Sequence, residues 1–231
     1  MKNKRELRDP SARCEVDLPA VITSIQPQKK NRNRFSLFHQ EHFILGLSSH
    51  SLLRFKLTKG VEITDTLFSR IVSEEQFLDV KDYLYRLLGR RDHSRDELRT
   101  KALQKGYESK QVEDVLEELE LKDLIDDESF ARKYIADKLS LQQWGPVKIR
   151  IHLLKKGISG SVIQHAMDEQ TRGLQLHQIC VDLAIKHKLR FLREKDGIKR
   201  KQKIMKYLQR KGFQYDTINR ALPEILNRLN V

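Results

Sequence analysis

The side chains best suited to chemistry in this sequence are lysines and arginines, which gather in three blocks. Between residues 186 and 211, twelve Lys or Arg stand against two Asp or Glu, and the whole chain carries 45 Lys and Arg against 32 Asp and Glu, a formal charge of +13. Such an excess attracts nucleic acid, acidic protein surfaces or anionic lipid, and charge alone does not choose among them. The candidate contact residues are Arg90, Arg91, Lys101, Lys105, Lys148, Arg150, Lys155, Lys156, Lys199, Arg200, Lys203 and Lys206.

The residue types that commonly catalyse reactions or bind metals are not spaced in this sequence as a catalytic or metal site requires. Asp126, Asp127 and Glu128 are consecutive at the start of a predicted helix, where carboxylates cap the backbone and match the helix dipole better than they converge on a metal. The two cysteines, Cys14 and Cys180, have no CxxC spacing, and burial as small apolar residues explains them. We therefore expect no enzyme activity, no metal and no cofactor.

Three glycines, Gly106, Gly157 and Gly212, mark an internal repeat that must position the basic residues. Apolar side chains recur at fixed distances from each glycine, with the i, i+3, i+4 spacing of an amphipathic helix. A glycine in the left-handed conformation ends one helix, and the apolar residue after it packs back on the last turn. The matched columns are Leu98, Ile149 and Ile204; Ala102, Leu153 and Leu208; Tyr107, Ile158 and Phe213; Val112, Ile163 and Ile218.

A further helix precedes each of these helix pairs, which makes every unit a three-helix repeat. Helix signals include a capping box at Ser94 and Glu97, a cap at Asp126 or Asp127, and Pro146 at a first helical position. The predicted divisions are a disordered basic tail over 1–19, a β/helix extension over 20–73, and repeats over 74–123, 124–172 and 173–231.

Only the extension carries strand signals. A β-branched run over 20–25 predicts a strand, and apolar runs over 34–38 and 42–47 flank a short polar loop, which predicts a hairpin. The fold class expected is therefore mostly α, with tandem three-helix repeats in an elongated, curved array and a small N-terminal β hairpin element.

The compartment is expected to be the cytoplasm, since the sequence shows neither an apolar run of membrane-spanning length nor a secretory signal. We expect a monomer without membrane contact.

Three motifs, in this order, resemble the RecX family of bacterial regulatory proteins: the Ser-capped segment 90–98, the segment 124–131 with its Asp-Asp-Glu-Ser-Phe-Ala core, and the Gly-Pro segment 145–149 leading to 154–158. The resemblance covers about residues 20–226. The chain departs from the family pattern at Lys138, Leu139 and Ser140, where a more arginine-rich stretch is expected.

The resemblance implies tandem three-helix repeats that bind the RecA recombinase filament on DNA. It also implies restraint of filament extension, ATP hydrolysis, strand exchange and co-protease action, and binding of single- or double-stranded DNA. The alternative function is a general nucleic-acid-binding helical repeat acting without RecA. Against that alternative, the helix after Gly106 is acidic in Glu113, Asp114, Glu117 and Glu118, whereas a helix that enters the major groove is expected to be basic.

Overall fold

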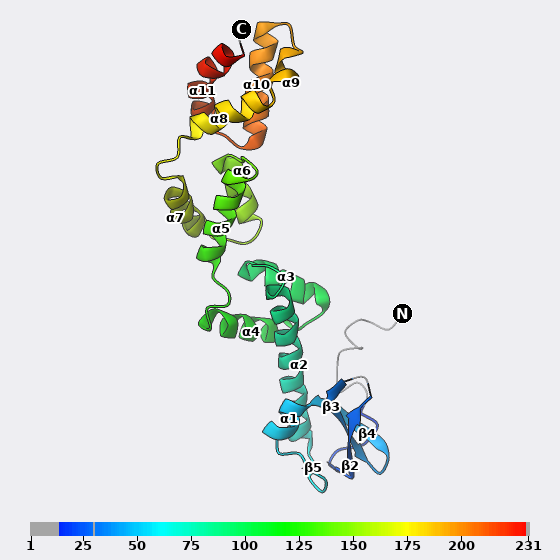
Figure 1. Cartoon of the computed structure of the whole chain (residues 1–231). Helices are drawn as coiled ribbons and strands as arrows, with labels where there is room; N and C mark the ends of the chain where they lie inside the picture. Colours follow the sequence, from blue (N-terminus) through cyan, green and yellow to red (C-terminus); the bar gives the residue numbers. More distant parts are fainter. Residues whose placement is uncertain (1–13, 30, 230–231) are drawn as a thin grey trace. The chain divides into compact units, whose positions relative to one another are not determined.

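The computed structural model describes residues 14–29 and 31–229. The chain separates into two compact units: unit 1 holds residues up to Arg91 together with Leu98–Leu124, and unit 2 holds Asp92–Glu97 and Ile125 onward. Most described residues are helical, with a small antiparallel sheet near the N-terminus (Figure 1). The predicted fold class of tandem helical repeats behind a β element is thereby confirmed.

Unit 1 begins with five strands and a short helix. Strands β2 (Ser24–Gln28), β3 (Asn31–His39) and β4 (His42–Ser48) form one antiparallel sheet in that order, and β1 (Ala20–Val21) pairs with β5 (Glu62–Ile63). The β3–β4 turn is made by Gln40 and Glu41, both with positive φ, as the tightest hairpin turns require. The predicted hairpin is thus confirmed.

The β element packs on helices α1 (Ser49–Arg54) and α2 (Asp65–Leu88) through one apolar core that includes Ile22, Leu45 and Ile71. A buried carboxylate fixes this junction: Glu75 Oε1 accepts hydrogen bonds from the Ser48 and Ser51 hydroxyls at 2.7 and 2.6 Å. The guanidinium of Arg34 pairs with its second oxygen at 3.0 Å. Burial of this charge is tolerable because it is paired and hydrogen-bonded.

Two predicted divisions differ from the structure. The tail expected over 1–19 is ordered from Cys14 onward: Glu15 N donates to Phe43 O at 2.9 Å, and Val16 and Leu18 pack on the β core. Residues 1–13 lie outside the described part. The division expected between 73 and 74 falls inside α2, a single helix that begins at its Thr64 cap and serves both the β element and the first repeat.

The helix pairs of the three repeats are α3 (Arg95–Lys105) with α4 (Ser109–Leu121), α6 (Pro146–Leu154) with α7 (Gly160–Thr171), and α10 (Gly197–Lys211) with α11 (Tyr215–Arg228). Helix α2 precedes the first pair and α5 (Asp127–Ser140) the second. Before the third pair the structure has two helices, α8 (Leu176–Lys186) and α9 (Lys188–Leu192), where the sequence predicted a single helix.

The glycine turns adopt the predicted conformation at all three positions. Gly106, Gly157 and Gly212 have φ of 95°, 77° and 93°. In each turn the residue after the glycine donates its backbone N–H to the carbonyl five residues earlier, from Tyr107 to Ala102, Ile158 to Leu153 and Phe213 to Leu208, all at 3.2 Å. The apolar columns are buried as expected, except that Tyr107 is only partly covered.

Within unit 2, two of these turns make equivalent contacts with the start of a preceding middle helix. The Ser94 hydroxyl donates to Lys156 O at 2.6 Å, and Gly145 N donates to Lys211 O at 2.7 Å. Ser94 lies the same number of residues before Gly106 as Gly145 lies before Gly157. Equivalent positions of two repeats therefore contact the glycine turn of the repeat that follows. At the start of α6 the carbonyls of this turn satisfy backbone N–H groups that the helix itself leaves unpaired, whereas at the start of α3 the donor is the Ser94 hydroxyl.

Candidate functional site: a cationic pocket in the third repeat

Helix α10 presents a buried apolar face and an exposed basic face. Asp196 caps its start by accepting from the backbone N–H groups of Ile198 and Lys199 at 2.8 and 3.1 Å, and Gly212 ends it. Ile204, Tyr207 and Leu208 are buried against α8 and α11. Because so many of the remaining positions are lysine or arginine, the outward face of this helix is strongly cationic.

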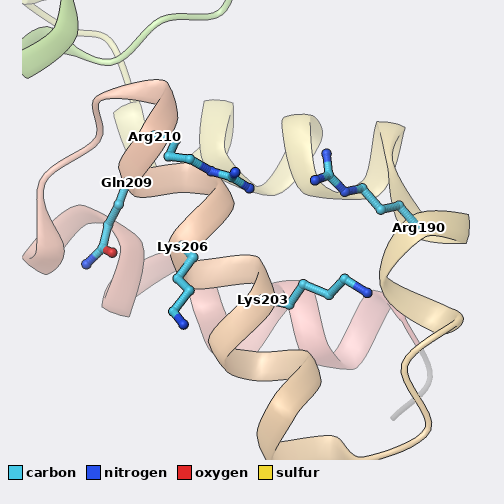
Figure 2. Close-up of a pocket in the computed structure, with 5 residues that line it drawn as sticks. All are labelled: Arg190, Lys203, Lys206, Gln209 and Arg210. Atoms are coloured by element: carbon cyan, nitrogen blue, oxygen red, sulfur yellow. The ribbon is translucent and has the colours of Figure 1, made fainter.

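A pocket of about 500 Å³ lies on this side of the third repeat. It is lined by Arg190 from α9 and by Lys203, Lys206, Gln209 and Arg210 from α10 (Figure 2). The two arginine side chains extend toward one another across the open space. The lining therefore has four cationic side chains and one amide, and no carboxylate among the lining residues offsets their charge.

Packing fixes the position of Arg190. Its guanidinium carbon lies 5.3 Å from the ring centroid of Tyr207, and the neighbouring Phe191 is fully buried with its ring 5.6 Å from the same tyrosine. Burial raises the pKa of Tyr207, with Arg190 and Arg210 acting in the opposite direction, so the phenol is neutral at physiological pH. A guanidinium stacked on a ring keeps its planar donors available for phosphate or carboxylate oxygens.

The sequence identified part of this pocket. Lys203 and Lys206 are among the predicted contact residues, whereas Arg190, Gln209 and Arg210 are not. Arg210 stands seven residues after Lys203, and this helical spacing places both on one side of α10. Arg190 comes from another helix, and only the packing of α9 on Tyr207 brings it to the pocket.

Arg200, also a predicted contact residue, is buried instead. Its side chain donates to the backbone carbonyls of Glu194 and Lys195 at 2.8 and 3.3 Å, which closes the loop between α9 and α10. The adjacent Lys199 is exposed near the start of α10. We therefore assign Arg200 to the fold and leave it out of the proposed contact surface.

The four candidates of the second repeat lie on or directly after α6. Lys156 is half-buried and forms an ion pair with Glu97 at 2.5 Å, so much of its charge is used within unit 2. Arg150 donates to the Gln164 side chain at 3.2 Å, and Lys155 is exposed. Lys148 places its ammonium 4.1 Å from the ring centroid of Trp144.

The candidates of the first repeat lie in unit 1. Arg90 and Arg91 are exposed in the turn after α2, Lys105 is exposed at the end of α3, and Lys101 on the same helix is half-buried.

Acidic residues serve the fold in the places where the sequence concentrates them. Asp126 Oδ1 accepts from the N–H groups of Glu128 and Ser129 at 2.8 and 3.0 Å, as a helix cap does. On α4, Glu113 pairs with Arg99 at 2.6 Å. Glu118 pairs with Lys81 at 2.7 Å and also with Lys122. These hydrogen bonds, with Lys122 first and then Lys81, lower the pKa of Glu118.

Among residues 14–29 and 31–229, no cluster of His, Cys, Asp and Glu has a metal-binding arrangement. Over the same ranges no helix combines the length and apolar character that crossing a bilayer requires.

Models of one protein family match four consecutive parts of the chain. The regulatory protein RecX N-terminal domain matches residues 20–64, and the first, second and third three-helix domains of RecX match residues 81–119, 126–167 and 177–222. A regulatory protein RecX of Clostridioides difficile (strain 630) is 30% identical over 209 residues, which are 90% of this chain and 96% of that protein. Another, from Prosthecochloris aestuarii (strain DSM 271 / SK 413), is 35% identical over 139 residues, 60% of this chain and 88% of that protein.

Solved structures agree with this assignment. A crystal structure of regulatory protein RecX superimposes with a TM-score of 0.71 at 25% identity, covering 87% of this chain and 98% of that one. A crystal structure of RecX from Lactobacillus salivarius shares the fold, with a TM-score of 0.60 at 24% identity over 66% of this chain and 97% of that one. With all four family domains present in order and a full-length relative at this level of identity, the chain belongs to the RecX family of regulatory proteins.

Proposed function

We propose that this chain binds the RecA recombinase filament on DNA and restrains its extension, ATP hydrolysis, strand exchange and co-protease action, without catalysing a reaction itself. The observation that carries the proposal is the carboxylate-free cationic pocket of the third repeat, in a chain whose family consists of regulatory proteins. A recombinase filament is a polymer of protein subunits on a polyanion, so it offers the counter-charge that this surface lacks.

Repetition supports a filament as the partner. Three helical repeats give one chain several points of attachment, and linked attachments to neighbouring subunits raise the overall affinity by effective concentration without requiring any single strong contact. A monomer is sufficient for this mode of binding, because the repetition lies within one chain.

The test is the single-stranded-DNA-dependent ATPase of RecA, titrated with this chain up to equal molar amounts of the two proteins, together with filament lengths measured by electron microscopy. We expect lower ATP hydrolysis and shorter filaments. A chain that leaves both unchanged at equal molar amounts contradicts the proposal.

A double variant locates the contact. Lys203→Glu with Lys206→Glu reverses two charges at the pocket, and we expect the inhibition to require at least about tenfold more protein because like charges then face the polyanion. A matched control, Lys59→Glu with Lys110→Glu, makes the same charge change at two exposed lysines that are neither in the pocket nor among the candidate contact residues. If both double variants lose inhibition equally, the effect comes from net charge and not from the pocket. Circular dichroism checks that each variant keeps its helices.

The alternative, nucleic-acid binding that acts without RecA, is favoured by one observation: phosphates suit the pocket lining as well as acidic side chains do. Binding of DNA through α4 is disfavoured, because this helix is acidic. Its carboxylates Glu113 and Glu118 already pair with Arg99 and Lys81 of unit 1. Unchanged RecA activity combined with tight, salt-sensitive DNA binding would select the alternative.

A further inference from the structure

Trp144, the single tryptophan of the chain, lies in the turn between α5 and α6, outside the pocket described above. Its backbone N–H donates to Lys138 O at 2.9 Å, which ties the turn to the end of α5. The indole packs against the core of the second repeat and is only partly buried, so part of it meets solvent.

Cationic and aromatic side chains surround this indole. The Lys148 ammonium lies 4.1 Å from its ring centroid, and the Lys138 ammonium lies 5.5 Å from it and 5.0 Å from the Tyr134 ring. The imidazole of His152 has its centroid 4.7 Å away, tilted by 44°. Lysine side chains are flexible, so Lys138 and Lys148 can move off the face of the indole and bind an anion at the edge of the ring.

Lys211 from the third repeat joins the same corner, donating to Gln142 O at 3.3 Å. Over the described part of the chain, neither Lys138, Lys148 nor Lys211 forms an ion pair with a carboxylate. Burial lowers the pKa of Lys211, and Lys148 and Lys186 lower it further. Burial likewise lowers the pKa of His152, with Lys148, Lys155, Lys156 and Lys138 as additional causes. The fold thus gathers like charges whose repulsion a bound anion would relieve.

We propose that the corner formed by Trp144, Lys138, Lys148, His152 and Lys211 binds an unpaired nucleotide of single-stranded nucleic acid, with the base stacked on the indole and the flanking phosphates on the lysines. A solvent-accessible aromatic ring among unpaired lysines supplies both contacts that binding of a single strand uses. The bases of a duplex are stacked on each other and are not available to stack on the indole. An acidic peptide would contact the lysines but would not need the aromatic ring.

The corner adjoins the pocket of the third repeat at the end of α10, where Arg210 lines the pocket and Lys211 reaches Gln142. The pocket and the corner are therefore linked by two consecutive residues of α10. The inference deepens the proposed function, on which it rests for the source of the strand, namely the DNA that the recombinase filament carries.

Trp144 provides its own probe, because it is the only tryptophan. The full-length chain is titrated with oligothymidylate at low salt, without any recombinase, while indole emission is recorded. We expect saturable quenching, since stacking on a base deactivates the excited indole. Duplex DNA, inorganic polyphosphate and polyglutamate are the comparison ligands, and we expect them to bind with little quenching.

Two outcomes overturn the inference. If oligothymidylate binds without quenching, the indole is not in contact with a base. If polyphosphate or polyglutamate quenches as deeply as the oligonucleotide, the corner recognises charge alone. Neither outcome touches the RecA ATPase measurement, so failure of this inference and failure of the proposed function are distinguishable.

Variants give a second, independent readout through the anisotropy of a labelled oligothymidylate. Trp144→Leu should weaken binding at least about fivefold, the lower end of what loss of one stacking platform costs, and Trp144→Phe should recover most of it. Lys148→Gln should reduce the slope of log affinity against log salt by about 0.7, the value for one phosphate contact on a single strand. The matched control Lys110→Gln, an equal charge loss on α4, should leave that slope unchanged. Equal effects of Lys148→Gln and Lys110→Gln would also overturn the site.

Discussion

The backbone N–H of Gly145 donates a 2.7 Å hydrogen bond to the carbonyl of Lys211, so the start of α6 is capped by the glycine turn of the following repeat. The two chain segments are so close that a Cβ on Gly145 would lie 2.3 Å from the carbonyl carbon of Gly212. In the other direction, a Cβ on Gly212 would lie 2.3 Å from Lys148 Cβ. The contact between the second and third repeats therefore tolerates no side chain at either glycine.

Gly212→Ala should destabilise unit 2 by about 2–5 kcal/mol. About 1–2 kcal/mol comes from the left-handed conformation and about 1–3 kcal/mol from the clash with Lys148. Gly173→Ala is the matched control, because Gly173 also has positive φ (77°) but open space around its Cβ position. The Gly173→Ala variant should lose only the part of the stability that comes from the left-handed conformation. Urea unfolding followed by circular dichroism measures both, and equal losses would show that the close packing at Gly212 is unimportant.

Arg200→Met should destabilise the third repeat by about 1.5–3 kcal/mol, the usual contribution of hydrogen bonds from a charged donor, because it removes the bonds to Glu194 O and Lys195 O. Lys199→Met, one residue earlier and exposed, should change the free energy of unfolding by less than about 0.5 kcal/mol. Thermal melts compare the two. A stable Arg200→Met variant with weakened nucleic-acid binding would return Arg200 to the contact surface.

The two cysteines should differ sharply in reactivity. Burial raises the pKa of Cys180 to about 12, so its thiol is almost entirely protonated at pH 8 and shielded by the core of the third repeat. Cys14 is only partly buried. With Ellman's reagent at pH 8, we expect one thiol to react in the native chain and both to react in urea. Cys14→Ser should abolish the native reaction, and a persistent fast phase in that variant would contradict the burial of Cys180.

Binding of oligothymidylate should strengthen as pH falls from 7.5 to 6. In the free chain, burial and the surrounding Lys148, Lys155, Lys156 and Lys138 lower the pKa of His152, so the imidazole is neutral at pH 7.5. Phosphates bound to Lys138 and Lys148 offset the charge of these lysines and raise the pKa of His152, so the complex takes up a proton more readily than the free chain as the pH falls. The affinity gain is at most about tenfold per pH unit for one proton.

His152→Gln should remove this pH dependence, whereas His165→Gln, at an exposed position on α7, should retain it. The same anisotropy titration at several pH values measures it. An identical slope in the wild type and in His152→Gln would place the responsible proton elsewhere.

The sequence by itself determined the repeat and the helices. Glycine position, apolar spacing and capping residues are local signals, since each depends on neighbours within one or two helical turns. For that reason the turns at Gly106, Gly157 and Gly212, the hairpin with its short polar loop, and a helix cap at Asp126 or Asp127 were all predictable. The break between α8 and α9 and the continuity of α2 through residue 73 were not, because neighbouring repeats and the β core decide which helices continue.

Only the tertiary structure decided which basic side chains belong to a site. Lys203 and Arg200 stand three residues apart in equally basic surroundings, yet one lines a pocket and the other is buried under a loop. Arg190 reaches the pocket from another helix, and Lys211 reaches Gln142, beside Trp144, across 69 residues of sequence. Such placements depend on contacts between segments distant in sequence, and the energy of a lysine or arginine depends on what packing puts beside it. A charge pattern alone carries no such information.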